Sequence, residues 1–147
     1  MEFSSATEPV EGSVQSQGGA TFRYKVRPLL PAEVNRILSA IPGAPNWTAM
    51  LHGANGAMGD TCRRALAGAS LVELLSATAS EADGGGEMTV RLRSKDAPPV
   101  ELRTVTGKDR DYLLDMLPVL SNGVADSALH AGFKVESDRG NSDSAPG

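Results

Sequence analysis

Cysteine is nearly absent from this sequence: Cys62 is the only one in 147 residues. A single cysteine excludes an internal disulfide bond and a zinc site built from cysteine ligands. No run of 18 apolar residues is present, which argues against a transmembrane helix. The first residues lack the basic and apolar segments of a signal peptide. We therefore expect a cytoplasmic protein, with peripheral attachment to a membrane or to the cytoskeleton left open.

Aromatic residues are also scarce, at 4% of the chain, whereas all hydrophobic residues together make up 40%. The core must therefore be built mainly from Leu, Val and Ala. The length suits one domain of ordinary size. The formal net charge is −4, and the acidity is concentrated at the two ends, which are rich in Ser, Gly and Pro. Such segments bury too little apolar surface to offset the entropy lost on ordering. We predict disordered tails at residues 1–19 and 135–147, around a single α+β domain at residues 20–134.

Two patterns open the predicted domain. In residues 21–27, Phe22, Tyr24 and Val26 alternate with basic residues, which is typical of a half-buried strand. Residues 31–41 carry an apolar stripe at helical spacing and begin with Pro31, which suits a first helical turn. A short strand is predicted in residues 46–53.

The segment 60–79 is ambiguous between helix and strand. Its alanines favour a helix, whereas "SLVELLSAT" also suits a strand, and Gly68 disfavours one long helix. We expect a helix or turn from Asp60 to about Leu66 and a strand from about Ser70.

The C-terminal half shows the clearest order. Residues 88–94 and 100–106 alternate as two strands joined by "DAPP". Residues 107–121 then form an amphipathic helix, with Thr106 and Asp109 placed for a capping box. A second short helical stretch is expected at "VADSALHAGF".

This order of elements, ending in "TVTGKDRDYLLDMLPVL", resembles the second half of a pleckstrin-homology (PH) domain. The resemblance covers about Ser70 to Leu120. It implies a bent antiparallel sheet or barrel closed by a capped C-terminal helix. It also implies an adaptor role, with binding to proteins or to phosphoinositides.

Basic residues alternate along two of the predicted strands. They are Arg23, Lys25 and Arg27 on the first, and Arg91, Arg93 and Lys95 on the second. If both strands belong to one sheet, these six charges line one surface, which would suit a phosphoinositide head group or an acidic protein surface. The alternative is an ordinary solvated strand face with acids interleaved. Nucleic acid is disfavoured, because exposed aromatic residues for base stacking are missing.

Catalytic and metal-binding patterns are weak. Cys62 and His52 could form a nucleophile and its base, but a lone cysteine is more often a small buried apolar residue. Two isolated histidines do not make a metal site. Asp109, Asp111 and Asp115 share one helix, and solvation together with the helix dipole explains them better than a metal.

The sequence thus predicts a non-enzymatic adaptor or scaffold module without cofactor or metal, which binds a protein partner or an anionic membrane. The alternatives are a small enzyme that uses Cys62 and His52, and a structural subunit of a larger assembly.

Overall fold

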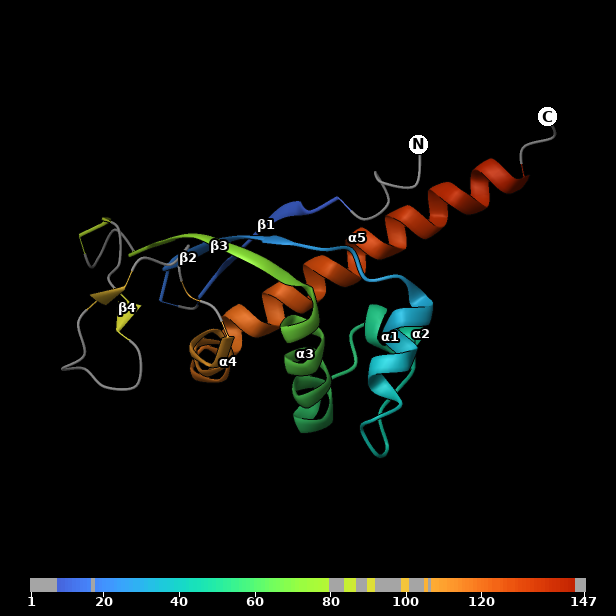
Figure 1. Cartoon of the computed structure of the whole chain (residues 1–147), viewed down its shortest axis with the longest axis horizontal. Coiled ribbons are helices and arrows are strands. Elements are labelled where there is room, and N and C mark those ends of the chain that lie inside the picture. The colour runs from blue at the N-terminus through green and yellow to red at the C-terminus, as the bar shows by residue number, and fades with distance from the viewer. Residues whose placement is uncertain are drawn as a thin grey trace.

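The computed structural model describes residues 8–16, 18–79, 84–86, 90–91, 99–100, 105 and 107–144. A three-stranded antiparallel sheet has the order β1-β2-β3, and a separate pair is formed by β4 and β5 (Figure 1). The strands are β1 (Val10–Gln15), β2 (Thr21–Val26), β3 (Leu71–Thr78), β4 (Val90–Arg91) and β5 (Pro99–Val100). The helices are α1 (Pro31–Leu38), α2 (Trp47–Leu51), α3 (Gly56–Ser70), α4 (Gly107–Met116) and α5 (Pro118–Ser144). The α+β class predicted from the sequence is confirmed.

Strand β1 lies inside the segment 1–19 that we predicted as disordered. It pairs with β2 along its whole length, from Val10 opposite Val26 to Gln15 opposite Thr21. A tight turn joins the two strands, in which the Ser16 amide donates to the Ala20 carbonyl at 2.8 Å. For residues 10–15 the prediction is wrong, because it considered only the apolar residues of the segment, whereas β1 is held by main-chain pairing to β2.

The junction between α3 and β3 resolves the ambiguity at 60–79. The chain is helical to Ser70 and extended from Leu71, so the predicted change of structure near Ser70 is confirmed. The helix does not end near Leu66 as expected. It continues across Gly68 because Leu66, Ala67 and Ser70 are all buried, and packing outweighs the low helix propensity of glycine.

The strand predicted in residues 46–53 is wrong. The chain forms α2 there, and the Asn46 side chain caps the helix by accepting a hydrogen bond of 3.0 Å from the Ala49 amide. Asparagine is among the preferred residues at this capping position.

Helix α5 contacts most of the other helices and strands. It is far longer than the short helix that was expected. Helix α4 ends at Met116, and α5 begins at Pro118 and runs to Ser144. Figure 1 shows α5 passing along the sheet and extending beyond the other elements toward the C-terminus. Its last ten helical residues lie in the segment 135–147 that we predicted as a disordered tail. Each residue added to an existing helix gains a main-chain hydrogen bond, so the packed part of α5 supports the extension.

Two glycines of α5 allow other elements to lie unusually close to it. A Cβ atom at Gly123 would come within 2.6 Å of the Val14 Cβ on β1. A Cβ atom at Gly132 would overlap the carbonyl oxygen of Leu29, in the connection between β2 and α1. Larger residues at these positions would push the sheet and this connection away from the helix.

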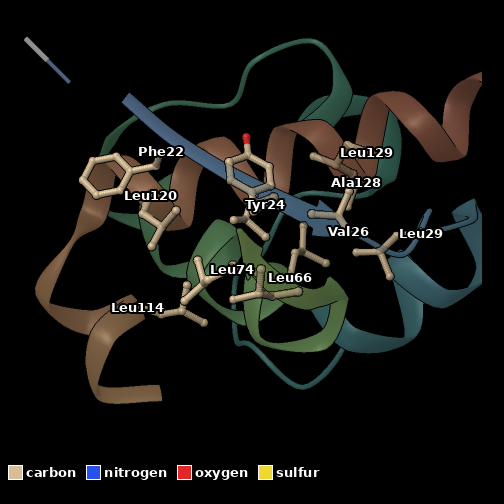
Figure 2. Packing of buried hydrophobic residues seen from close by; sticks show 14 of the residues in the cluster. Phe22, Tyr24, Val26, Leu29, Leu66, Leu74, Leu114, Leu120, Ala128 and Leu129 are labelled. Carbon is tan, nitrogen blue, oxygen red and sulfur yellow. The ribbon is translucent and has the colours of Figure 1, made fainter. Parts of the chain in front are cut away.

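The core lies between the inner face of the sheet, α3 and α5 (Figure 2). Phe22, Tyr24 and Val26 of β2 all point inward, as the alternating pattern predicted. They pack with leucines from four other elements: Leu66, Leu74, Leu114, Leu120 and Leu129.

The sheet is open, not closed into a barrel. In the described part of the chain β1 and β3 are its two edges, and β4 and β5 pair only with each other. Strand structure within the predicted segments 88–94 and 100–106 is described only at residues 90–91 and at residue 100. Val105 is also described. The rest of both segments, including Thr106, lies outside the described residues. The PH-like barrel is therefore not what the described strands form.

Candidate partner-binding surface

The predicted basic residues of β2 lie on the outer face of the sheet, next to carboxylates. Arg23 donates to Glu11 of β1, with the Nη2 atom 2.7 Å from Oε2. Lys25 is exposed and stands opposite Glu11 on one side and Glu73 of β3 on the other. The outer face of the β1-β2-β3 sheet thus alternates positive and negative charges.

Arg27 has a different role from Arg23 and Lys25. Its guanidinium donates to both carboxylate oxygens of Glu33 in α1, at 2.7 and 2.8 Å, and to the Ala69 carbonyl at 2.9 Å. The hydrogen bonds and charge of Arg27 lower the pKa of the Glu33 carboxyl below its ordinary value. Arg27 therefore fastens the end of β2 to α1 and to the end of α3.

The second predicted basic set is only partly described. Arg91 lies in β4, which pairs with β5 and does not join the sheet that contains β2. Arg93 and Lys95 lie outside the described residues. The shared sheet that motivated a common six-charge surface is therefore not found among the described strands.

Cys62 lies on the inward side of α3 and is completely buried. Burial raises the pKa of its thiol, which favours the neutral form, a poor nucleophile. His52 is exposed at the end of α2. Within the described residues, no hydrogen bond joins His52 to Cys62, and no three metal-binding side chains gather in one place. No described helix has the length and apolar character needed to cross a bilayer.

A groove opens where α3, α4 and α5 meet, and we refer to it as the α3–α4–α5 groove. Its volume is about 330 Å³. It is lined by Asp60, Thr61, Arg64, Leu114, Asp115, Pro118, Ser121 and Asn122. The Ser121 hydroxyl is buried and donates to the Leu114 carbonyl, which holds the start of α5 against the end of α4.

Arg64 forms one wall of this groove and joins α3 to α4. Its Nε atom lies 2.5 Å from Oδ1 of Asp115, and its Nη2 atom donates to the main-chain carbonyl of Asp111 at 3.1 Å. A longer ion pair of 3.5 Å reaches the Asp111 carboxylate. The planar guanidinium suits such multiple contacts. Solvation and the helix dipole were therefore an incomplete explanation of Asp111 and Asp115.

Two large apolar side chains stand exposed at the corner between α4 and α5. Met116 is 45% exposed and Val119 is 39% exposed. Each directly follows a residue that lines the groove, namely Asp115 and Pro118. The sequence pattern did not indicate this corner, because residues 107–121 were predicted as one continuous helix. Pro118, which suits the first turn of a helix, was the available signal for a break.

We compared the chain with known protein families, curated proteins and solved structures, and none of them matches it.

Proposed function

We propose that this protein is a non-enzymatic adaptor that binds a protein partner through the α3–α4–α5 groove. The observation that carries the proposal is an open hollow with two exposed apolar residues, Met116 and Val119, each next in sequence to a residue that lines it. Apolar anchors surrounded by polar residues dominate the binding energy of protein interfaces. Methionine adapts easily to different partner shapes because its side chain is unbranched and flexible.

The charges on the sheet favour a protein partner over an anionic membrane. Arg23 is paired with Glu11, and Lys25 lies between Glu11 and Glu73, so the outer face has little excess positive charge. Membrane attraction depends on several unpaired basic residues near the lipid surface. The outer face of the sheet is therefore the weaker candidate.

The burial of Cys62 favours binding over catalysis. A thiol that is completely buried and has a raised pKa is poorly placed to attack a substrate. The proposal keeps the cytoplasmic location expected from the sequence. It also accommodates the structural-subunit alternative, because a permanent neighbour in an assembly would use the same groove.

Site-specific photo-crosslinking in the cells that produce the protein tests the proposal. The photoreactive residue p-benzoylphenylalanine is introduced at Val119, beside the groove, and in a control variant at Ser13, which is exposed on β1. We expect one protein to crosslink at Val119 and not at Ser13. Once that protein is purified, Met116→Asp should weaken its binding at least about tenfold, because a charge replaces an apolar anchor. Ser13→Asp should leave binding unchanged.

Three outcomes would argue against the groove. The partner could crosslink only at Ser13, nothing could crosslink at Val119, or Met116→Asp could bind normally. Sedimentation with phosphatidylserine vesicles examines the membrane alternative. The anionic membrane would be favoured if the protein binds these vesicles, the Arg23→Glu/Lys25→Glu variant does not, and no protein crosslinks at Val119.

A further inference from the structure

The α3–α4–α5 groove has an excess of negative charge. The charged residues among those that line it are Asp60, Arg64 and Asp115. Arg64 is already engaged by Asp115 and Asp111. Among the residues that line the groove, two carboxylates therefore stand against one guanidinium group.

Asp60 is the carboxylate best placed for a ligand. It is exposed on α3, and its side chain makes no hydrogen bond or ion pair with any other described residue. Asp115, on the α4 side of the groove, uses its Oδ1 atom to hold Arg64 and keeps further acceptor capacity, since an ionised carboxylate accepts about four hydrogen bonds. Free acceptors thus occur on both sides of the groove.

Two of the residues that line the groove are apolar. Leu114 of α4 is almost completely buried, and Pro118 is exposed at the corner between α4 and α5. Lysine and arginine side chains combine a long apolar stem with a charged end, and they place the stem on apolar surface while the charge stays among polar groups. The groove has both kinds of surface.

We infer that the partner inserts a basic side chain, from lysine or arginine, into the α3–α4–α5 groove. Its stem packs on Leu114 and Pro118, and its charge lies between Asp60 and Asp115. The inference rests on the proposed function, because it specifies the chemistry of the segment that this groove binds. An apolar residue beside the basic one would contact Met116 or Val119.

NMR titration of the full-length protein with two short peptides tests the inference. The probes are acetyl-GLKLG-amide and acetyl-GLELG-amide, which differ only in the central charge. We expect the lysine peptide to bind weakly and to shift the amide signals of Thr61, Asp115 and Asn122, and the glutamate peptide to leave them in place. Asp60→Asn should weaken binding of the lysine peptide about threefold to fivefold, as for loss of one exposed ion pair.

Asp138→Asn is the matched control, because Asp138 is an exposed carboxylate of α5 that does not line the groove. It should leave the affinity unchanged. Equal binding of both peptides, shifts located on the sheet instead of the groove, no binding of the lysine peptide, or an unchanged affinity in Asp60→Asn would each overturn the inference. The crosslinking experiment at Val119 does not depend on charge, so a partner captured there would still support the proposed function.

Discussion

Tyr24 of β2 and Ser127 of α5 share a hydrogen bond of 2.9 Å between their hydroxyl groups, although 103 positions separate them in the sequence. This contact connects the central strand β2 to α5. Tyr24 is completely buried, and burial raises the pKa of its hydroxyl. Removing this contact by mutation therefore measures how much it contributes to the stability of the packing between the sheet and α5.

Tyr24→Phe should lower the free energy of unfolding by about 1 kcal/mol near neutral pH, the usual net value of one hydrogen bond. The raised pKa adds a pH dependence. The stabilisation from the neutral hydroxyl is fully present below about pH 10, the pKa of an unfolded tyrosine, and is lost as the pH rises toward the folded pKa. Urea unfolding should therefore show an alkaline loss of stability in the native protein that is smaller in Tyr24→Phe. Tyr112→Phe is the control, and an equal effect there would contradict the assignment.

Arg27→Gln should raise the pKa of Glu33 toward its ordinary value. Because Arg27 lowers this pKa in the folded state, the pair stabilises the protein above about pH 4.3 and is lost as the pH falls through the folded pKa. We expect a loss of about 1 kcal/mol near neutral pH, within the range of partly exposed ion pairs. Carboxyl NMR titration measures the pKa directly. Arg36→Gln removes a longer, 3.5 Å contact to the same Glu33 and should change the pKa less; the opposite order would refute the prediction.

Gly132→Ala should destabilise the fold by about 2 kcal/mol or more. The added Cβ atom would overlap the Leu29 carbonyl, so α5 or the connection before α1 must move, as in other overpacked cores. Gly68→Ala is the matched control in α3, where the new atom would lie 3.0 Å from the Nη1 atom of Arg64, at the end of a long side chain. Alanine is favoured over glycine inside helices by up to about 1 kcal/mol, so Gly68→Ala should be neutral or stabilising. Chemical denaturation compares the free energies of unfolding of the two variants. A loss in Gly132→Ala no larger than that in Gly68→Ala would contradict the prediction.

Much of the local structure follows from short-range patterns in the sequence. The period-two alternation of Phe22, Tyr24 and Val26 predicted β2 and its inward face, and Pro31 with its apolar stripe predicted α1. The start of the strand near Ser70 was also predicted, although the helix before it continues beyond the expected end at Leu66. These features were accessible because the periodicity of side chains within a strand or helix is a property of neighbouring residues alone.

The candidate site required the tertiary structure. Arg64 meets Asp111 and Asp115 across about 50 intervening residues, and no local pattern pairs them. Likewise, Glu11 lies in a segment that composition alone marked as disordered, yet it forms an ion pair with Arg23 once β1 joins the sheet.

The sequence by itself determined the alternation of β2, the start of α1, the α+β class and a core poor in aromatic residues. The tertiary structure alone decided the length of α5, the open sheet and the groove at the corner of α4 and α5. The physical reason is that these features depend on long-range packing. Main-chain pairing recruits β1, close contacts at Gly123 and Gly132 position α5, and the ion pairs of Arg64 hold α3 against α4.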